Sequence, residues 1–119
     1  MQNKMRKFLK IFKVELEELE DELIMFGEMH KQREQSGEIT TYVFRENMNL
    51  IKNEISGLQE IIRSVDGLVP TKYKSFEEMI EDLDRKIKER LRESEHADAS
   101  YELVRRKLKK VHTYIREET

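Results

Sequence analysis

Apolar residues in the first half of the chain recur at intervals that alternate between four and three. These intervals place side chains along one seam of an α-helix, as in the heptad repeat of helices that pack lengthwise. The first series consists of Met5, Leu9, Phe12, Leu16, Leu19, Leu23 and Phe26. Lys, Glu and Leu, which favour helix, occupy most of the other positions. The pattern predicts one helix over residues 2–35.

A second series of the same kind follows a short polar stretch, QSGEITT. It consists of Phe44, Met48, Ile51, Ile55, Leu58, Ile62 and Val65. Gly37 can take the left-handed conformation that ends a helix, and Thr40 or Thr41 can cap the next one. A helix over 41–66 is therefore expected, and the short connection makes it the antiparallel neighbour of the first helix.

A third helix is expected to begin at Phe76. Gly67 and Pro70 disfavour continuation of the second helix. The segment Ser75-Phe-Glu-Glu78 is a capping-box motif, which is typical of a helix N-terminus. Neither Gly nor Pro follows it, so nothing in the composition ends this helix before the C-terminus.

The third seam weakens in the middle, at LRESEHADAS. Its members are Phe76, Ile80, Leu83, Ile87, Arg90, Ser94, Ala97, Tyr101, Val104, Leu108, Val111 and Ile115. Because the four-three phase is kept through the polar members, the pattern favours one continuous helix over 76–117. The alternative is a break near residues 94–98, which splits the segment at 94–99 and leaves Asp98 or Ser100 to cap a fourth helix.

Charge patterning bears on the same choice. If the third segment runs along the first helix, basic residues of 85–92 lie beside the acidic stretch 15–22. A segment folded back on itself keeps that pairing and brings 105–110 near the basic N-terminus. We expect a single all-α domain over 1–119. It is either an antiparallel coiled-coil hairpin with a long third helix, or a four-helix bundle if the third helix breaks.

Composition limits the classes of function. The 119 residues are 37% hydrophobic and 40% charged, which is too polar for a thick core and suits long helices with narrow seams. The absence of cysteine excludes thiol catalysis, disulfides and Cys-ligated zinc. A net charge of −2 provides no general attraction to nucleic acid. No stretch reaches transmembrane length, and Lys10 and Lys13 interrupt the N-terminal apolar run, so we expect no membrane span, no signal peptide and a cytoplasmic location.

Glu93 and His96 are metal-ligand types that lie one helical turn apart. Ferritin-like di-metal bundles carry such a Glu-x-x-His pair twice, whereas this chain carries it once. His30 stands at a seam position where leucine is expected, and a continuous third helix brings His96 to nearly the same height. His30, Glu93 and His96 could then hold zinc or another divalent ion. The favoured interpretation is a polar layer that sets helix register, so we expect no metal or other cofactor.

The acidic helices invite comparison with all-helical pyrophosphatases of the MazG type, which carry Glu-Glu-x-x-Glu on one helix and Glu-x-x-Asp on the next. The nearest match here is Glu17-Glu18-Leu-Glu-Asp21, followed by Glu46-Asn-Met-Asn49. Asp21 and Asn49 depart from that motif, and loss of a carboxylate weakens a site for a hard cation. We do not assign the chain to that family.

The C-terminal part of the chain carries two candidate binding surfaces. A continuous third helix reaches or passes the hairpin loop, which leaves an apolar stripe that needs another chain. The residues of this stripe are Tyr101, Val104, Leu108, Val111 and Ile115. Basic residues that could contact a phosphate backbone lie between them. They are Arg105, Arg106, Lys107, Lys109 and Lys110.

These patterns favour a non-enzymatic helical interaction protein: a scaffold, an adaptor or an oligomeric subunit. Its expected partner is a second copy of the chain or another helical protein, because regular heptad seams bind helices. The alternative is nucleic-acid binding through 105–110. A metal-dependent enzyme, either MazG-like or of the di-metal type, ranks third.

Overall fold

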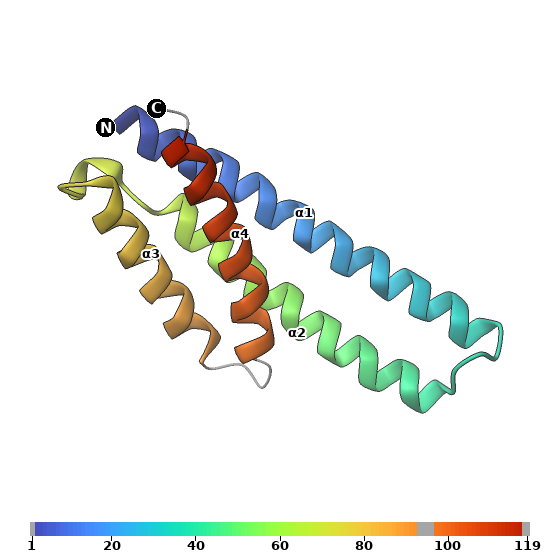
Figure 1. The fold of residues 1–119 in the computed structure, drawn as a ribbon. Helices are drawn as coiled ribbons and strands as arrows, with labels where there is room; N and C mark the ends of the chain where they lie inside the picture. The colour runs from blue at the N-terminus through green and yellow to red at the C-terminus, as the bar shows by residue number, and fades with distance from the viewer. Residues whose placement is uncertain (1, 93–96, 118–119) are drawn as a thin grey trace.

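The fold is built from helices and contains no strand in the part of the chain that the structure describes. In the computed structural model this part comprises residues 2–92 and 97–117. Its elements are α1 (Gln2–Gln35), α2 (Thr41–Asp66), the short 3-10 helix η1 (Pro70–Lys72), α3 (Phe76–Leu91) and α4 (Ala97–Glu117) (Figure 1). The all-α prediction is confirmed.

α1 and α2 form an antiparallel hairpin with the expected bounds. Gly37 takes the left-handed conformation, with φ at 81°, where the chain leaves α1. The Thr40 hydroxyl then accepts a hydrogen bond of 3.1 Å from the Val43 amide and so caps α2. At the other end of the hairpin, Nζ of Lys13 in α1 pairs with the carboxylate of Asp66 at the end of α2, at 2.9 Å.

The start of α3 carries a variant of the predicted capping box. The Ser75 hydroxyl accepts a hydrogen bond of 3.1 Å from the Glu78 amide, as the motif requires. The Glu78 carboxylate accepts its return bond from the amide of Lys74, also at 3.1 Å, and not from that of Ser75. The motif thereby provides a partner for the Glu78 amide, which the first turn of the helix leaves unpaired, and for the Lys74 amide, which precedes the helix.

The expectation of one continuous helix over 76–117 is wrong. α3 ends at Leu91, and α4 begins at Ala97 and runs back beside it (Figure 1). As a result, Nε2 of His112 in α4 lies 3.0 Å from Oε1 of Glu77 in the first turn of α3. The alternative with four helices describes the fold. Residues 93–96, which connect the two helices, lie outside the described part of the chain.

Burial of apolar side chains on α4 explains why the chain folds back. In a continuous helix beyond the hairpin, these side chains would remain in water, at a cost of roughly 1.5–3 kcal/mol each. In the structure they lie in one core with α1, α2 and α3. The core residues of α4 are Val104, Leu108, Val111 and Ile115.

The core occupies one half of the hairpin, which we call the base. There α3 and α4 pack against the first part of α1 and the last part of α2 (Figure 1). The fully buried side chains of the base include Met5, Phe8, Phe12 and Leu16 of α1, Ile61 of α2, and Met79, Leu83 and Ile87 of α3. No helix in 2–92 or 97–117 is long and apolar enough to cross a membrane.

The other half of the hairpin, residues 20–35 and 41–57, projects beyond the base, and we call it the arm (Figure 1). Helix lengths account for it. α1 has 34 residues and spans about 51 Å, whereas the 16 residues of α3 and the 21 of α4 span about 24 and 32 Å. The two short helices α3 and α4 cannot cover the whole length of α1, so part of the hairpin extends beyond them. The molecule is accordingly elongated and measures 55 by 27 by 19 Å.

Candidate interaction surface on the arm

One face of α1 passes from the core of the base to the surface of the arm. Phe12, Leu19 and Phe26 occupy the same heptad position and therefore lie on one side of the helix. Phe12 is 0% exposed and Leu19 is 6% exposed, but Phe26 is 55% exposed. Phe26 is therefore as apolar as the core residues of the base, but it lies beyond the part of the hairpin that α3 and α4 cover.

Met29 extends the same exposed face by almost one turn. It lies three heptads after Phe8, which is buried in the base, and two heptads after Glu15, which pairs with α4. Glu15 pairs with α4 and Phe8 meets Phe76 at the start of α3, so α4 and α3 cover this side of α1 in the base. In the arm the Met29 side chain is exposed.

On α2 the matching exposed side chains are Val43 and Leu50. They share a heptad position with Ser64, which lies in the base beside Lys86 and Arg90 of α3. Val43 and Leu50 therefore continue the side of α2 that α3 covers. Together, Phe26, Met29, Val43 and Leu50 form what we call the open face of the arm.

The two helices of the arm pack closely beneath the open face. A Cβ atom at Gly27 would lie 3.3 Å from the terminal methyl carbon of Met48, so the backbone of α1 closely approaches this side chain. Ile51 is buried between the helices. The arm is thus a packed helix pair, with further exposed apolar side chains outside the open face. These are Ile24, Met25 and Tyr42.

The metal set predicted from the sequence is not assembled by the described residues. His30 lies on the arm, where its Nδ1 is 3.0 Å from the Phe26 carbonyl oxygen. Glu93 and His96 lie outside the described part of the chain. Within 2–92 and 97–117, no group of three or more histidine and carboxylate side chains is placed to hold a metal ion.

The carboxylates of the MazG-like near-match do not converge either. Gly27 lies beside Met48, so Glu46 lies opposite a part of α1 nearer the tip than Gly27. Glu18 precedes Gly27 by nine residues, which is about 13 Å of helix. A single cation cannot bridge carboxylates at that separation, because oxygen ligands bind Mg²⁺ at about 2.0–2.1 Å.

The predicted partner-binding stripe is part of the core of the base. Val104, Leu108, Val111 and Ile115 are all buried within the chain, so the prediction that they bind another chain is wrong. It depended on a continuous third helix, whereas the observed fold provides them with intramolecular partners. The side chain of Tyr101, the fifth residue of the stripe, lies outside the described part.

The basic cluster of α4 is only partly available to a partner. Lys107 and Lys110 hold the Glu15 carboxylate of α1, with Nζ–O distances of 3.1 and 3.0 Å. Their hydrogen bonds, that of Lys110 above all, lower the pKa of Glu15. The chain therefore places this cluster against the acidic stretch of α1 and not against the basic N-terminus. The remaining members, Arg105, Arg106 and Lys109, are exposed.

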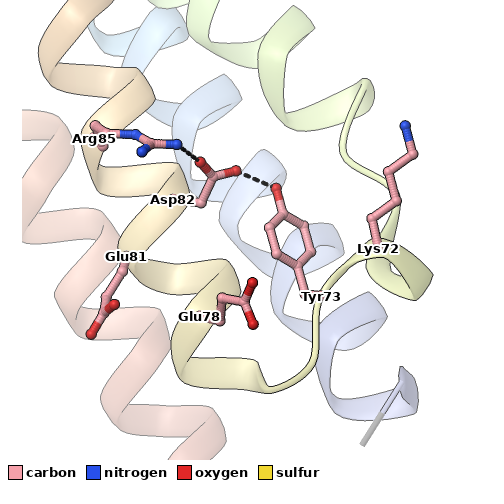
Figure 2. A pocket seen from close by; sticks show the side chains of 6 residues that line it. All are labelled: Lys72, Tyr73, Glu78, Glu81, Asp82 and Arg85. Atoms are coloured by element: carbon pink, nitrogen blue, oxygen red, sulfur yellow. Dashed lines mark hydrogen bonds and ion pairs between the residues drawn. The ribbon is translucent and has the colours of Figure 1, made fainter.

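A polar cluster that sequence patterns did not single out joins the loop after α2 to α3. Figure 2 shows Tyr73 beside a shallow pocket, with its hydroxyl group donating to the Asp82 carboxylate. Arg85 pairs with the same carboxylate, and the Lys86 Nζ lies 3.2 Å from it. Tyr73 precedes the cap Ser75 and has no place in any heptad seam, so only the fold relates it to Asp82.

The electrostatics of this cluster are those of a structural contact. Burial, followed by the hydrogen bond to Asp82, raises the pKa of Tyr73 to about 12. The Tyr73 hydroxyl, and then Lys86 and Arg85, lower the pKa of Asp82 against the opposing effect of burial. Both groups therefore stay in one ionisation state near pH 7, and the Asp82 carboxylate fastens the loop to α3.

Asp82→Asn is expected to lower the free energy of unfolding at pH 7 by about 1–2 kcal/mol, because it replaces a hydrogen-bonded carboxylate. The pKa of Asp82 is lowered below its ordinary value of 3.8, so its charged form stabilises the fold above that pH. This contribution is lost as the pH falls through the lowered pKa, and the two proteins should then converge. Urea unfolding at several pH values measures the difference.

Glu81→Gln is the matched control, because Glu81 lines the same pocket but is exposed. It should change the free energy of unfolding by less than about 0.5 kcal/mol. A constant difference between wild type and Asp82→Asn at all pH values would contradict the role assigned to this carboxylate.

No protein-family model, curated protein or solved structure shows a significant match to this chain.

Proposed function

We propose that this chain is a non-enzymatic helical interaction protein of the cytoplasm, which acts as a scaffold, adaptor or oligomeric subunit. It binds a partner through the arm, by the coiled-coil type of packing that its heptad pattern favours. The base supplies stability and holds the arm out from the rest of the molecule. The observation that carries the proposal is the passage of one heptad series from complete burial at Phe12 to exposure at Phe26.

The residues of the open face suit this role. Four large apolar side chains on one side of a helix pair resemble a core from which the covering helices have been removed. Met29 adds a flexible, polarisable side chain that adapts to irregular contacts. Val43 and Leu50 supply the second helix of the surface, so a partner helix can pack against side chains of both α1 and α2.

The alternative functions have less support. For nucleic-acid binding, Lys107 and Lys110 are engaged with Glu15, and the net charge of the chain is −2. For a metal-dependent enzyme, no group of three or more histidine and carboxylate side chains among the described residues is placed to hold a metal ion. Neither of these two alternative functions gives a role to the arm.

Site-specific photocrosslinking tests the proposal. The photoreactive residue p-benzoylphenylalanine is placed at Met29, on the open face, in cells that produce the chain. We expect discrete crosslinked products from this position, because a bound partner lies within reach of its side chain. Product masses from denaturing gels and mass spectrometry then identify the partner.

The matched control carries the same residue at Asn49. This position is exposed, and its heptad equivalents Ser56 and Arg63 are exposed as well, so it lies on the outer side of α2. Few or no products are expected there. Equal products from Met29 and Asn49, or none from Met29, would contradict an interaction through the open face.

A further inference from the structure

We propose that the occupant of the open face is a second copy of this chain, bound arm to arm in antiparallel orientation. The two-fold axis passes α1 between Gly27 and Glu28. This inference rests on the proposed function, because it names the partner of the same surface. It is argued from the placement of apolar and charged residues about that axis.

The apolar residues of α1 are placed symmetrically about this point. In an antiparallel pair of α1 helices related by the axis, Phe26 of one copy faces Met29 of the other, and Met29 faces Phe26. A two-fold interface must be self-complementary in this way, because each contact occurs twice. Both side chains are exposed on the side of α1 that α4 and α3 cover in the base.

The exposed apolar residues of α2 obey the same axis. Val43 and Leu50 are equidistant from the midpoint between Glu46 and Asn47. In the register of the hairpin, Gly27 lies beside Met48, so the midpoint on α1 and the midpoint on α2 are within about one helical residue of the same height. One axis therefore relates both pairs, and Val43 of one copy faces Leu50 of the other.

The flanking charges are complementary in the antiparallel orientation. Glu22 and Arg33 lie one turn outside Phe26 and Met29 on the same side of α1, and both are exposed. The axis sets Glu22 of one copy against Arg33 of the other, twice in the dimer. Within one chain Nε of Arg33 lies 3.8 Å from the Glu38 carboxylate, and this weak contact can be replaced by one with Glu22 of the other copy.

The length of the arm fits the same arrangement. On the open side of α1, Leu19 is the last buried residue and the helix ends at Gln35. The uncovered segment 20–35 is centred between Gly27 and Glu28, where the symmetry of the side chains also places the axis. Two arms overlapped about this point cover the whole of the uncovered segment of α1 in each copy, and the tip of each arm meets the base of the other.

Sedimentation velocity across a range of concentrations, with the full chain, tests the inference. We expect a concentration-dependent species of twice the 14.4 kDa chain mass. Arg33→Glu should weaken dimerisation by roughly tenfold, since it replaces two attractions by two repulsions. Combining Glu22→Arg with Arg33→Glu should restore most of the affinity, because the exchanged charges again face one another. A monomer at every concentration up to several hundred micromolar overturns the inference.

Two controls keep the result specific. Lys31→Glu makes the same charge change at an exposed position whose heptad equivalents, Glu17 and Ile24, are also exposed, and should leave dimerisation unchanged. Circular dichroism checks that all variants keep their helices. A dimer that ignores both Arg33→Glu and its rescue by Glu22→Arg overturns the proposed geometry.

The proposed function can survive failure of this inference. If the chain is monomeric and Met29 crosslinks to a different protein, the second copy is the wrong occupant, but the open face remains an interaction surface. If the chain is monomeric and Met29 yields no product, both proposals fail. Crosslinked products of twice the chain mass, together with charge-swap rescue, support both.

Discussion

Phe12→Ala is expected to lower the free energy of unfolding by about 3–5 kcal/mol. The Phe12 ring is fully buried and stacks against Phe8, with 5.6 Å between the ring centroids. Phe8 in turn meets the edge of Phe76 at the start of α3, also at 5.6 Å. Truncation leaves a cavity where α1 meets the rest of the core, and the surrounding helices relax only partly into it.

Chemical denaturation followed by circular dichroism measures this effect, and Phe26→Ala is the matched control. Phe26 occupies the same heptad position two repeats later and differs from Phe12 in its exposure. At protein concentrations where the chain is monomeric, its truncation should cost less than about 1 kcal/mol. Equal losses for both variants would mean that the arm is covered within the monomer.

Leu108→Asp is expected to prevent stable folding of the base. The side chain lies in the core, and a buried carboxylate without a partner adds a large desolvation cost to the lost apolar contacts. We expect a loss of more than about 4 kcal/mol, which approaches the whole stability of many small domains. Helix content at 25 °C and the midpoint of thermal unfolding should both fall sharply.

Leu103→Asp provides the comparison within the same helix. Leu103 is 38% exposed, whereas Leu108 is 5% exposed. The Leu103 variant should retain its helices and unfold within about 1 kcal/mol of the wild type. If instead Leu108→Asp remained fully folded, α4 would not be docked as described, and the C-terminal stripe would again be available to a partner.

The helices that form the hairpin could be predicted closely because local signals agree there. The heptad series, Gly37 at the end of α1 and Thr40 at the start of α2 all indicate the same boundaries. At Ser75 the cap is likewise local: a side chain meets an amide three residues away. Such signals depend on a few neighbouring residues and can be read without knowledge of the fold.

The break after α3 could not be decided in the same way. Among the side chains that the structure describes, Ile87 and Val104 are the nearest core residues on either side of it, and an interval of that length can be divided into steps of three and four. A preserved phase therefore does not distinguish a long helix from two shorter ones. The deciding factor is the burial of α4 against α1 and α3, which is tertiary and has no local signature.

The open face exists because α3 and α4 are separate helices, each shorter than α1. Their separation was not the prediction that the sequence favoured, so the open face could not be predicted either. With a continuous third helix, Phe26 would lie in a covered seam and the C-terminal stripe would be exposed. In the structure these roles are reversed. The contact between Tyr73 and Asp82 was also beyond sequence patterns, because it joins a loop residue to a helix flank.

Because the base is packed separately from the two-helix arm, the length of the arm can change without altering the packing of the base. Seven residues added to each helix of the arm would extend it by about 10 Å and restore the same angular phase. No contact of the base would need to change. Related chains could therefore differ in the length of the arm by whole heptads, inserted in pairs, one in each of its two helices.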